Sequence, residues 1–161
     1  MSVAEAIIST LRDRGMTMAL AESLTGGLLV AELIAVPGAS HVVRGGVVAY
    51  DTAIKQTVLG VDADLLAEHG PVHPEVARQM ADRVRTVLAV NGKPADVGLS
   101  TTGVAGPGAQ GEHPAGTVYV GFALGGRVFA ELLQLEGDRE AIRKGTVSES
   151  LVRLHQELAT A

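Results

Sequence analysis

The sequence predicts an α/β protein whose mixed sheet carries helices on both faces. Segments with helical periodicity alternate with short apolar, β-branched runs along the whole chain, a pattern typical of strands that are connected through helices. Two longer strand-like runs, 117–124 and 128–135, are joined through Gly125-Gly126 and predict an antiparallel hairpin. A chain of 161 residues has the usual size of one domain, so we expect a single domain over residues 1–161.

The composition argues against several classes of function. Aromatic residues make up 2% of the chain and the formal net charge is -5, so neither the stacking side chains nor the basic surface of a nucleic-acid-binding protein is present. The absence of cysteine rules out a disulfide framework, a thiol nucleophile and a cysteine-built zinc site. The N-terminus lacks a signal pattern, and no segment reaches about 18 uninterrupted apolar residues. We therefore expect a cytoplasmic protein with no nucleic-acid or membrane partner.

The first half of the chain carries clear start and stop signals. Apolar residues with helical spacing end at Gly15, which fits a C-cap, and Pro37-Gly38 ends the next helix because proline disfavours helix in the residue before it. A β-branched run that ends at Tyr50 is interrupted by Gly45-Gly46, which indicates a bulge or a close backbone approach. The predicted elements are a helix over 2–14, a strand over 16–21, a helix from Thr25 to before Pro37, a strand over 41–50, a short helix through Lys55 to Leu59 and another from Asp62 to Glu68.

The second half of the chain carries signals of the same kinds. Pro74 opens a longer helix, as proline does at a first helical position, and Asn91-Gly92 ends it. A short strand over 95–100 then leads into 101–108, which is too glycine-rich and too apolar for an ordinary surface loop. After the hairpin, Asp138 caps a final helix on which apolar residues recur with helical spacing. The loop over 101–108 is therefore a candidate ligand-binding segment.

The stretch Ala21-Glu22-Ser23-Leu24-Thr25-Gly26-Gly27 places a hydroxyl where a strand turns into a helix. Helix N-termini present unpaired N–H groups, so this turn is able to hold an anion or an oxyanion that develops during a reaction. The two glycines let the backbone come close to a ligand. The simpler interpretation is that Ser23 is an ordinary N-cap, and the turn alone leaves both interpretations open.

Candidate side chains from separate segments meet at one edge of the predicted sheet. Ser23, Tyr50 and Thr102 lie where strands end, and ligands of open α/β sheets bind outside the carboxyl ends of the strands. A serine that attacks an amide needs a base, and Lys55 is a candidate because burial lowers the pKa of a lysine. The alternatives are a solvated Lys55, a Tyr50 that only ends its strand, and Glu22 as the base, although adjacent strand residues point to opposite faces.

Other polar residues concern phosphate, metal and cofactor binding. Arg139 and Arg143 lie four residues apart on one helical face, where they either clamp a phosphate or form the charged first turn of an amphipathic helix. The five histidines show no metal-binding spacing, so we expect no metal site. Neither glycine-rich loop matches a Walker loop or a dinucleotide fingerprint. We therefore expect no cofactor.

Five motifs occur together in order: AESLTGG, PGASHVVRGGVVAYDTAIKQTVLGV, TTGVAGPG, PAGTVYVGFA and GDREAIR. From about Thr17 to Arg143 the chain therefore resembles the CinA C-terminal domain family, whose enzymatic members are nicotinamide mononucleotide amidohydrolases. The resemblance implies a three-layer α/β/α sandwich that hydrolyses the carboxamide of nicotinamide mononucleotide, without a metal, to nicotinic acid mononucleotide and ammonia. It also implies self-association, so we expect a homo-oligomer whose small-molecule partner is a pyridine mononucleotide.

The resemblance further implies roles for individual residues. Ser23 is similar to the nucleophile of the family, and Tyr50 and Lys55 match the tyrosine and lysine that follow its GGxVxY motif, with catalytic roles. Backbone N–H groups near Thr25 to Gly27 are expected to hold the oxyanion. The expected substrate-binding residues are Thr25, Gly26, Gly27, Thr102, Gly103, Gly106, Arg139 and Arg143, and the resemblance does not say which arginine reaches the phosphate.

The chain departs from the family pattern near the rim of the expected site. The family usually reads AVSE where this chain has Pro71-Val72-His73-Pro74, and a lysine is common where His113 stands. Many members carry an additional N-terminal domain, and this chain resembles the stand-alone form. Two alternative functions stay open, namely a non-catalytic nucleotide-binding or regulatory module of the same fold and an amidase for another small carboxamide.

Overall fold

The sheet of the protein contains both parallel and antiparallel strands. The computed structural model describes residues 1–161 and orders the strands β2 (Val43–Val48), β1 (Met18–Glu22), β3 (Val97–Gly103), β4 (Thr117–Leu124) and β5 (Arg127–Gln134). β1 pairs in parallel with β2 and β3, while β4 pairs antiparallel with β3 and β5. The predicted mixed sheet is therefore confirmed, including the hairpin of the last two strands.

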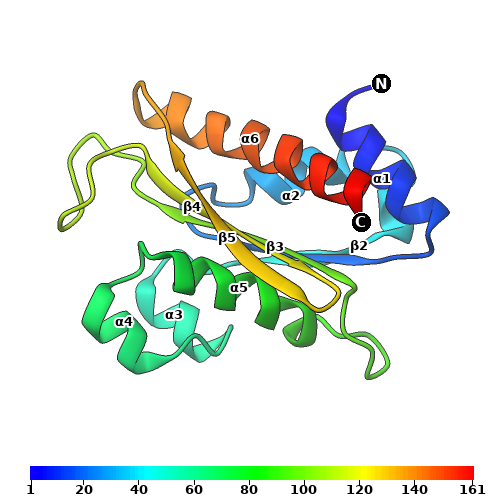
Figure 1. Cartoon of the computed structure of the whole chain (residues 1–161), viewed down its shortest axis with the longest axis horizontal. Helices are drawn as coiled ribbons and strands as arrows, with labels where there is room; N and C mark the ends of the chain where they lie inside the picture. Colours follow the sequence, from blue (N-terminus) through cyan, green and yellow to red (C-terminus); the bar gives the residue numbers. More distant parts are fainter.

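Helices cover both faces of this sheet (Figure 1). One layer contains α1 (Val3–Asp13), α2 (Leu28–Ile34) and α6 (Arg139–Thr160), and the other contains α3 (Thr52–Thr57), α4 (Ala63–His69) and α5 (Pro74–Val87). The larger hydrophobic core lies under the first layer, where Ile7, Leu29 and Leu154 pack with sheet residues such as Leu99 and Phe122. A smaller core lies between the sheet and the second layer. This arrangement confirms the predicted α/β class with three layers.

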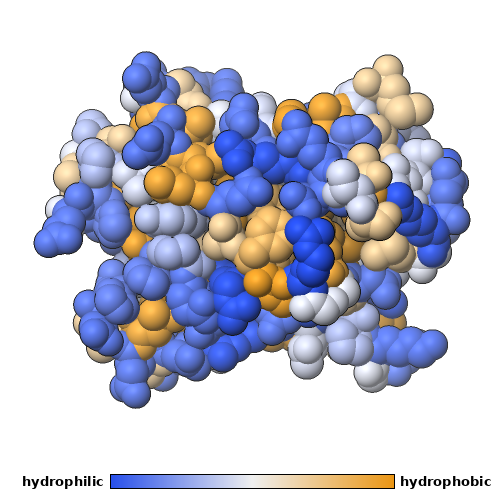
Figure 2. Space-filling model, in the orientation of Figure 1, coloured by the Kyte–Doolittle hydropathy of each residue, from blue (hydrophilic) through white to orange (hydrophobic).

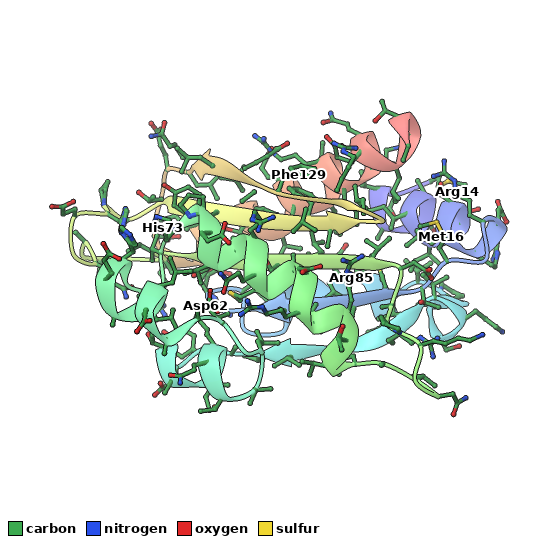
Figure 3. All side chains as sticks on the ribbon, turned by 60° about the horizontal axis from the view of Figure 1, so that its bottom comes forward. Arg14, Met16, Asp62, His73, Arg85 and Phe129 are labelled. Atoms are coloured by element: carbon green, nitrogen blue, oxygen red, sulfur yellow. The ribbon has the colours of Figure 1, made fainter.

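The longest helix of the second layer, α5, lies directly on the backbone of the central strands (Figure 3). A side chain at Gly98 would overlap the Ala81 carbonyl oxygen, and one at Gly121 would overlap that of Ala77. The Ser100 hydroxyl donates a hydrogen bond to the same Ala77 carbonyl at 2.6 Å. Glycine at these two positions therefore permits the close approach of helix and sheet, which holds the N-terminus of α5 near the carboxyl end of β3.

Among the element boundaries that differ from the prediction, two lie near the candidate site. The helix expected from Thr25 begins at Leu28, because Gly26 and Gly27 have φ angles of 58° and 104° and interrupt the helical path. Residues 101–103, expected in a loop, extend β3 because they pair with β4 as far as Val118. The turn after β1 is therefore longer, and the loop after β3 shorter, than the sequence predicts.

The surface combines hydrophilic residues with separate hydrophobic patches, as Figure 2 shows for one face. β2 and β5 form the two edges of the sheet, and Leu132 on β5 is 45% exposed. Edge strands keep unpaired main-chain groups along one side. None of the helices combines the length and the hydropathy that crossing a membrane requires.

Candidate active site

Ser23 lies directly after β1, at the carboxyl end of the strand. Its main-chain N–H donates to the Thr101 carbonyl at 3.0 Å, which ties the turn to β3, and the residue is only 7% exposed. The cap position of α2 is occupied by Gly27, with no side-chain capping bond. The interpretation of Ser23 as the N-cap is therefore wrong, and its hydroxyl is available for another partner.

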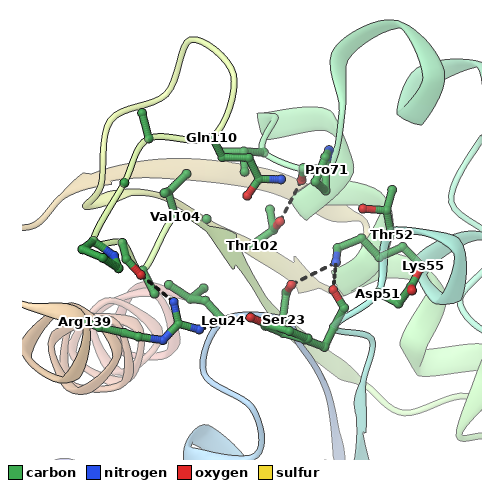
Figure 4. A pocket seen from close by; sticks show the side chains of 18 residues that line it. Ser23, Leu24, Asp51, Thr52, Lys55, Pro71, Thr102, Val104, Gln110 and Arg139 are labelled. Carbon is green, nitrogen blue, oxygen red and sulfur yellow. Dashed lines mark hydrogen bonds between the residues drawn. The ribbon is translucent and has the colours of Figure 1, made fainter.

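Lys55 is that partner. Asp51 begins α3 by accepting the Ala53 N–H at 2.8 Å, and the helix carries Lys55 one turn further to the end of β1. The lysine is 1% exposed, and its Nζ lies 2.9 Å from Ser23 Oγ and 2.6 Å from the Ala49 carbonyl oxygen (Figure 4). The interpretation of Lys55 as a solvated helix residue is therefore wrong.

The surroundings of Lys55 favour its neutral form. Burial lowers its pKa from 10.5 to about 8, and the negative charge of Asp51 opposes this shift. Its hydrogen-bond acceptors are the Ser23 hydroxyl and the carbonyls of Ala49 and Tyr50, none of which carries a charge. When Lys55 is neutral, its two hydrogens are directed to the two carbonyls and its lone pair is left to accept the Ser23 proton, so the direction of the Ser23 hydrogen bond reverses. The pair thus has the composition of a nucleophile and its general base.

A pocket of about 640 Å³ opens at this pair, within the size range of small-molecule sites. Its charged lining residues are Asp51, Lys55 and Arg139. Ser23 and Lys55 lie at one side and Arg139 at the other in the close view (Figure 4). The remaining lining comes from Leu24, Tyr50, Thr52, Pro71-Val72 and the segment 102–110.

Several main-chain N–H groups that were expected to bind an oxyanion have an internal partner. The Glu22 carboxylate, which is fully buried, accepts the N–H groups of Gly27, Leu29 and Val30 at 2.9 to 3.1 Å. The N-terminus of α2 therefore holds an acidic side chain of the protein itself. Gly26 N–H is also engaged, because it donates to the Ser23 carbonyl. Gly26 and Gly27 are thus not free to bind an oxyanion, contrary to the expectation.

The free donors of this turn are the N–H groups of Leu24 and Thr25, which donate to no other protein group. Leu24 lines the pocket and directly follows Ser23. The N–H of the residue after a nucleophile is a common oxyanion donor, since the two groups share one turn. Leu24 was not among the site residues predicted from the sequence, although its position next to the candidate nucleophile was the available signal.

Tyr50 and Arg139 meet at the rim of the pocket. Tyr50 is 62% exposed, and its hydroxyl accepts a hydrogen bond from Arg139 Nη2 at 3.1 Å. Arg139 Nη1 donates to the Gly106 carbonyl at 2.6 Å. Tyr50 reaches Lys55 only through its main-chain carbonyl, at 3.5 Å from Nζ. The structure therefore brings the Tyr50 hydroxyl to Arg139 rather than to the Ser23–Lys55 pair.

The other expected site residues divide into two groups. Thr102 lines the pocket and donates from Oγ1 to the Pro71 carbonyl at 2.7 Å. Its neighbours Gly103 and Gly106 line the pocket as well. The expected residues outside the lining are Thr25, Gly26, Gly27 and Arg143. The Thr25 hydroxyl forms a hydrogen bond with the Thr101 hydroxyl at 2.8 Å. Arg143 Nε donates to the Leu24 carbonyl at 2.8 Å. Asp51, Thr52 and Gln110 line the pocket without having been predicted to do so.

The positions that depart from the family pattern border the pocket. His73 caps α5 by accepting the Glu75 N–H on Nδ1 at 3.1 Å, and Pro74 is the first residue of that helix. Burial, followed by the charges of nearby histidines, lowers the pKa of His73. His73 and His113 line a second hollow that shares Pro71 with the active-site pocket. No group of three or more His, Cys, Asp or Glu side chains is arranged to hold a metal ion.

The fold and the site define an α/β protein with a ligand pocket at the carboxyl ends of parallel strands and a buried serine–lysine pair inside it. The model of the CinA C-terminal domain family matches residues 1–158. The chain belongs to this family.

Relatives and solved structures agree with this assignment. A relative from Caldanaerobacter subterraneus, named as a competence-damage inducible protein, is 50% identical over 140 residues, which cover 86% of this chain and 33% of the relative. A CinA-like protein from Frankia casuarinae is 43% identical over 153 residues, or 95% of this chain and 34% of the relative. The chain thus spans about a third of the length of these relatives.

Among solved structures, a CinA superfamily protein from Klebsiella pneumoniae has a TM-score of 0.91 at 30% identity, with 99% of this chain and 97% of that chain covered. A competence/damage inducible protein from Agrobacterium tumefaciens has a TM-score of 0.89 at 32% identity, with 98% of this chain and 93% of that chain covered. These likenesses confirm the fold over nearly the whole chain.

Proposed function

We propose that the chain is an amidohydrolase that converts nicotinamide mononucleotide to nicotinic acid mononucleotide and ammonia. The observation that carries this proposal is the 2.9 Å contact between Lys55 Nζ and Ser23 Oγ, made by a lysine whose pKa is lowered to about 8 by burial. The resemblance to a family whose enzymatic members hydrolyse this nucleotide supports the choice of substrate.

In the first half of the reaction, Ser23 attacks the carboxamide carbon while neutral Lys55 takes the proton from Oγ. The carbonyls of Ala49 and Tyr50 hold the two amine hydrogens, so the lone pair faces Ser23. The Leu24 N–H donates to the oxyanion of the tetrahedral intermediate. The Lys55 ammonium then protonates the leaving nitrogen, the C–N bond breaks and ammonia departs, leaving an ester on Ser23.

In the second half, water hydrolyses this ester. Lys55 takes a proton from the water as its oxygen attacks the acyl carbon, and the same oxyanion donor serves again. Lys55 returns the proton to Ser23 Oγ when the C–O bond breaks. The product leaves as a carboxylate, so one amide and one water give one carboxylate and one ammonium ion. The same two residues therefore serve both halves.

Arg139 is the arginine that we assign to the substrate phosphate. It lines the pocket, whereas Arg143 does not, and its two protein acceptors, the Gly106 carbonyl and the Tyr50 hydroxyl, are neutral. An arginine has five N–H donors, so further donors stay available for phosphate oxygens. Thr102 and Gly103 line the space between this rim and Ser23 and are the candidates for contact with the ribose.

Incubation of the purified protein with nicotinamide mononucleotide tests the proposal. We expect release of ammonia together with nicotinic acid mononucleotide, identified by chromatography. The Ser23→Ala variant should lose this activity while keeping the unfolding temperature of the wild type. Full activity of that variant would contradict the nucleophile assignment.

The same assay separates the alternative functions. A non-catalytic nucleotide-binding module would bind the mononucleotide tightly and release no ammonia. An amidase for another small carboxamide would show no preference for the mononucleotide over free nicotinamide, which has no phosphate for Arg139. Self-association, and the lack of nucleic-acid and membrane partners, stay predictions.

A further inference from the structure

We propose that Arg143 is a positioning residue for the oxyanion-binding turn and does not bind the substrate phosphate. The inference rests on the proposed function, because it assigns the Leu24 N–H to the oxyanion. Its basis is an Arg143 guanidinium that does not line the pocket and that donates to the main chain of the turn. Arg143 Nε donates to the Leu24 carbonyl at 2.8 Å, and Nη2 donates to the Thr25 carbonyl at 3.4 Å.

The hydrogen bonds of the turn show what the arginine holds. The carbonyls of Ser23 and Thr25 accept the N–H groups of Gly26 and Leu28, so the Leu24 carbonyl depends on Arg143 alone. Buried main-chain carbonyls are rarely left without a partner, and losing one costs free energy. Without Arg143, the Leu24–Thr25 peptide would therefore lose the bond that fixes its plane.

The plane of this peptide matters for the donors of the site. The carbonyl and the N–H of a trans peptide point in opposite directions, so the bond from Arg143 to the Leu24 carbonyl also sets the direction of the Thr25 N–H. A charged donor on the carbonyl polarises the peptide and strengthens its N–H as a donor. The same bond also holds Leu24, whose own N–H, in the preceding Ser23–Leu24 peptide, faces the oxyanion in the proposed mechanism.

The glycine of the turn makes room for this contact. Gly26 has a φ angle of 58°, and a side-chain carbon there would lie 3.3 Å from Arg143 Nη2. On the other side of the turn, the Glu22 carboxylate holds the first N–H groups of α2. The Arg143 guanidinium thus holds carbonyls of the turn, and the Glu22 carboxylate holds N–H groups at its other end. Only the Leu24 and Thr25 N–H groups of the turn stay free.

The test compares four variants on two substrates. Arg143→Gln removes both the planar fork and the charge, whereas Arg143→Lys removes the fork and keeps the charge. Arg139→Gln removes the proposed phosphate ligand. Lys144→Gln is the matched control because the side chain of this lysine is 69% exposed on the same helix. The substrates are nicotinamide mononucleotide and nicotinamide riboside, which share the carboxamide and the ribose and differ in the phosphate. Thermal unfolding of each variant reports folding separately.

A positioning role predicts that Arg143→Gln lowers kcat by about tenfold to a hundredfold on both substrates, as expected for a misaligned oxyanion donor, and leaves KM nearly unchanged. Arg143→Lys should recover part of the loss. Arg139→Gln should instead raise KM for the mononucleotide and reduce its preference over the riboside. An Arg143→Gln variant that raises KM for the mononucleotide alone, or that keeps wild-type kcat, would overturn the inference.

A second readout does not depend on the natural substrate. A fluorophosphonate labels an activated serine when Oγ forms a bond to phosphorus, the P–F bond breaks, fluoride leaves and Lys55 takes the proton. We expect Arg143→Gln to slow labelling of Ser23 at least about tenfold and Lys144→Gln to leave it unchanged. If the wild type releases no ammonia from either substrate, the proposed function fails. Labelling that is equally fast in Arg143→Gln and wild type would then reject the positioning role as well.

Discussion

The pH dependence of the reaction follows from how much of Lys55 is neutral. Burial lowers the pKa of this lysine from 10.5 to about 8, which disfavours the ammonium form by about 3 kcal/mol. Only the neutral amine is able to accept the proton of Ser23. We therefore expect kcat/KM to rise with pH, with a midpoint near pH 8 and a plateau above it.

The expected size of the effect is large enough to measure directly. With a pKa of about 8, about a tenth of Lys55 is neutral at pH 7 and about a hundredth at pH 6. Ammonia release at low substrate concentration should therefore fall about tenfold for each pH unit below the midpoint. Nicotinamide riboside belongs in the same series, because a phosphate monoester titrates near pH 6 and adds its own dependence for the mononucleotide.

Asp51→Asn provides a second arm of the same experiment. The Asp51 carboxylate raises the pKa of Lys55 against the effect of burial, so its removal should move the midpoint to lower pH. Asparagine is as good an N-cap as aspartate and should keep the start of α3. Asp13→Asn, with a side chain 70% exposed at the end of α1, is the control and should leave the profile unchanged.

Two results would contradict the assignment of Lys55 as the titrating base. A rate that is independent of pH between about 6 and 9, where a base with a pKa near 8 must titrate, would exclude Lys55 as the base. A midpoint that stays the same in Asp51→Asn would show that the titrating group lies elsewhere in the protein.

Three further predictions concern stability. The pKa of Lys55 is about 8 in the folded protein, against the ordinary 10.5, so the unfolded chain binds more protons than the folded protein between these two values. The free energy of unfolding should therefore rise by up to about 3 kcal/mol from pH 8 to 10.5. Denaturant titrations should show this rise in the wild type and not in Lys55→Met. Gly121→Ala would overlap the Ala77 carbonyl and should cost about 1 to 3 kcal/mol, seen as a lower unfolding temperature. Gly126→Ala, with no atom near the added carbon, is its control and should unfold close to the wild type. His73→Ala removes the cap of α5 and should cost about 1 kcal/mol. His73→Asn should retain most of that stability in the same thermal measurement.

Patterns that repeat along the chain predicted the fold class correctly. Helical periodicity, the glycine pair at 125–126 and the proline at position 74 led to the hairpin of β4 and β5 and to the start of α5, as the structure has them. The element boundaries near the site were less accurate, since the positive φ angles of Gly26 and Gly27 and the pairing of residues 101–103 with β4 depend on tertiary contacts.

The site was predictable to the extent that its residues follow strands. Ser23, Lys55 and Thr102 line one pocket, because the carboxyl ends of β1 and β3 lie at the same edge of the sheet. The role of Glu22 was not predictable in the same way. Strand alternation directs its side chain away from Ser23, but only the position of α2 reveals that its carboxylate accepts three N–H groups.

The two arginines of α6 show a second limit of sequence reasoning. Their four-residue spacing predicts one common face, and it does not distinguish a residue over the pocket from a residue over the turn. The structure assigns Arg139 to the pocket rim and Arg143 to the carbonyl of Leu24. Successive turns of a helix meet different neighbours, so tertiary position separates two residues that the sequence treats alike.

The proposed mechanism requires Ser23 and Lys55 to act as one catalytic unit. The most direct measurement is kcat for ammonia release from nicotinamide mononucleotide by Ser23→Ala, Lys55→Ala and the double variant, all shown to be folded. If the two residues form a unit, each single variant should lose about a thousandfold or more, and the double variant should lose little beyond that. Losses that multiply in the double variant, or a Ser23→Ala protein that keeps wild-type kcat, would contradict the serine–lysine mechanism.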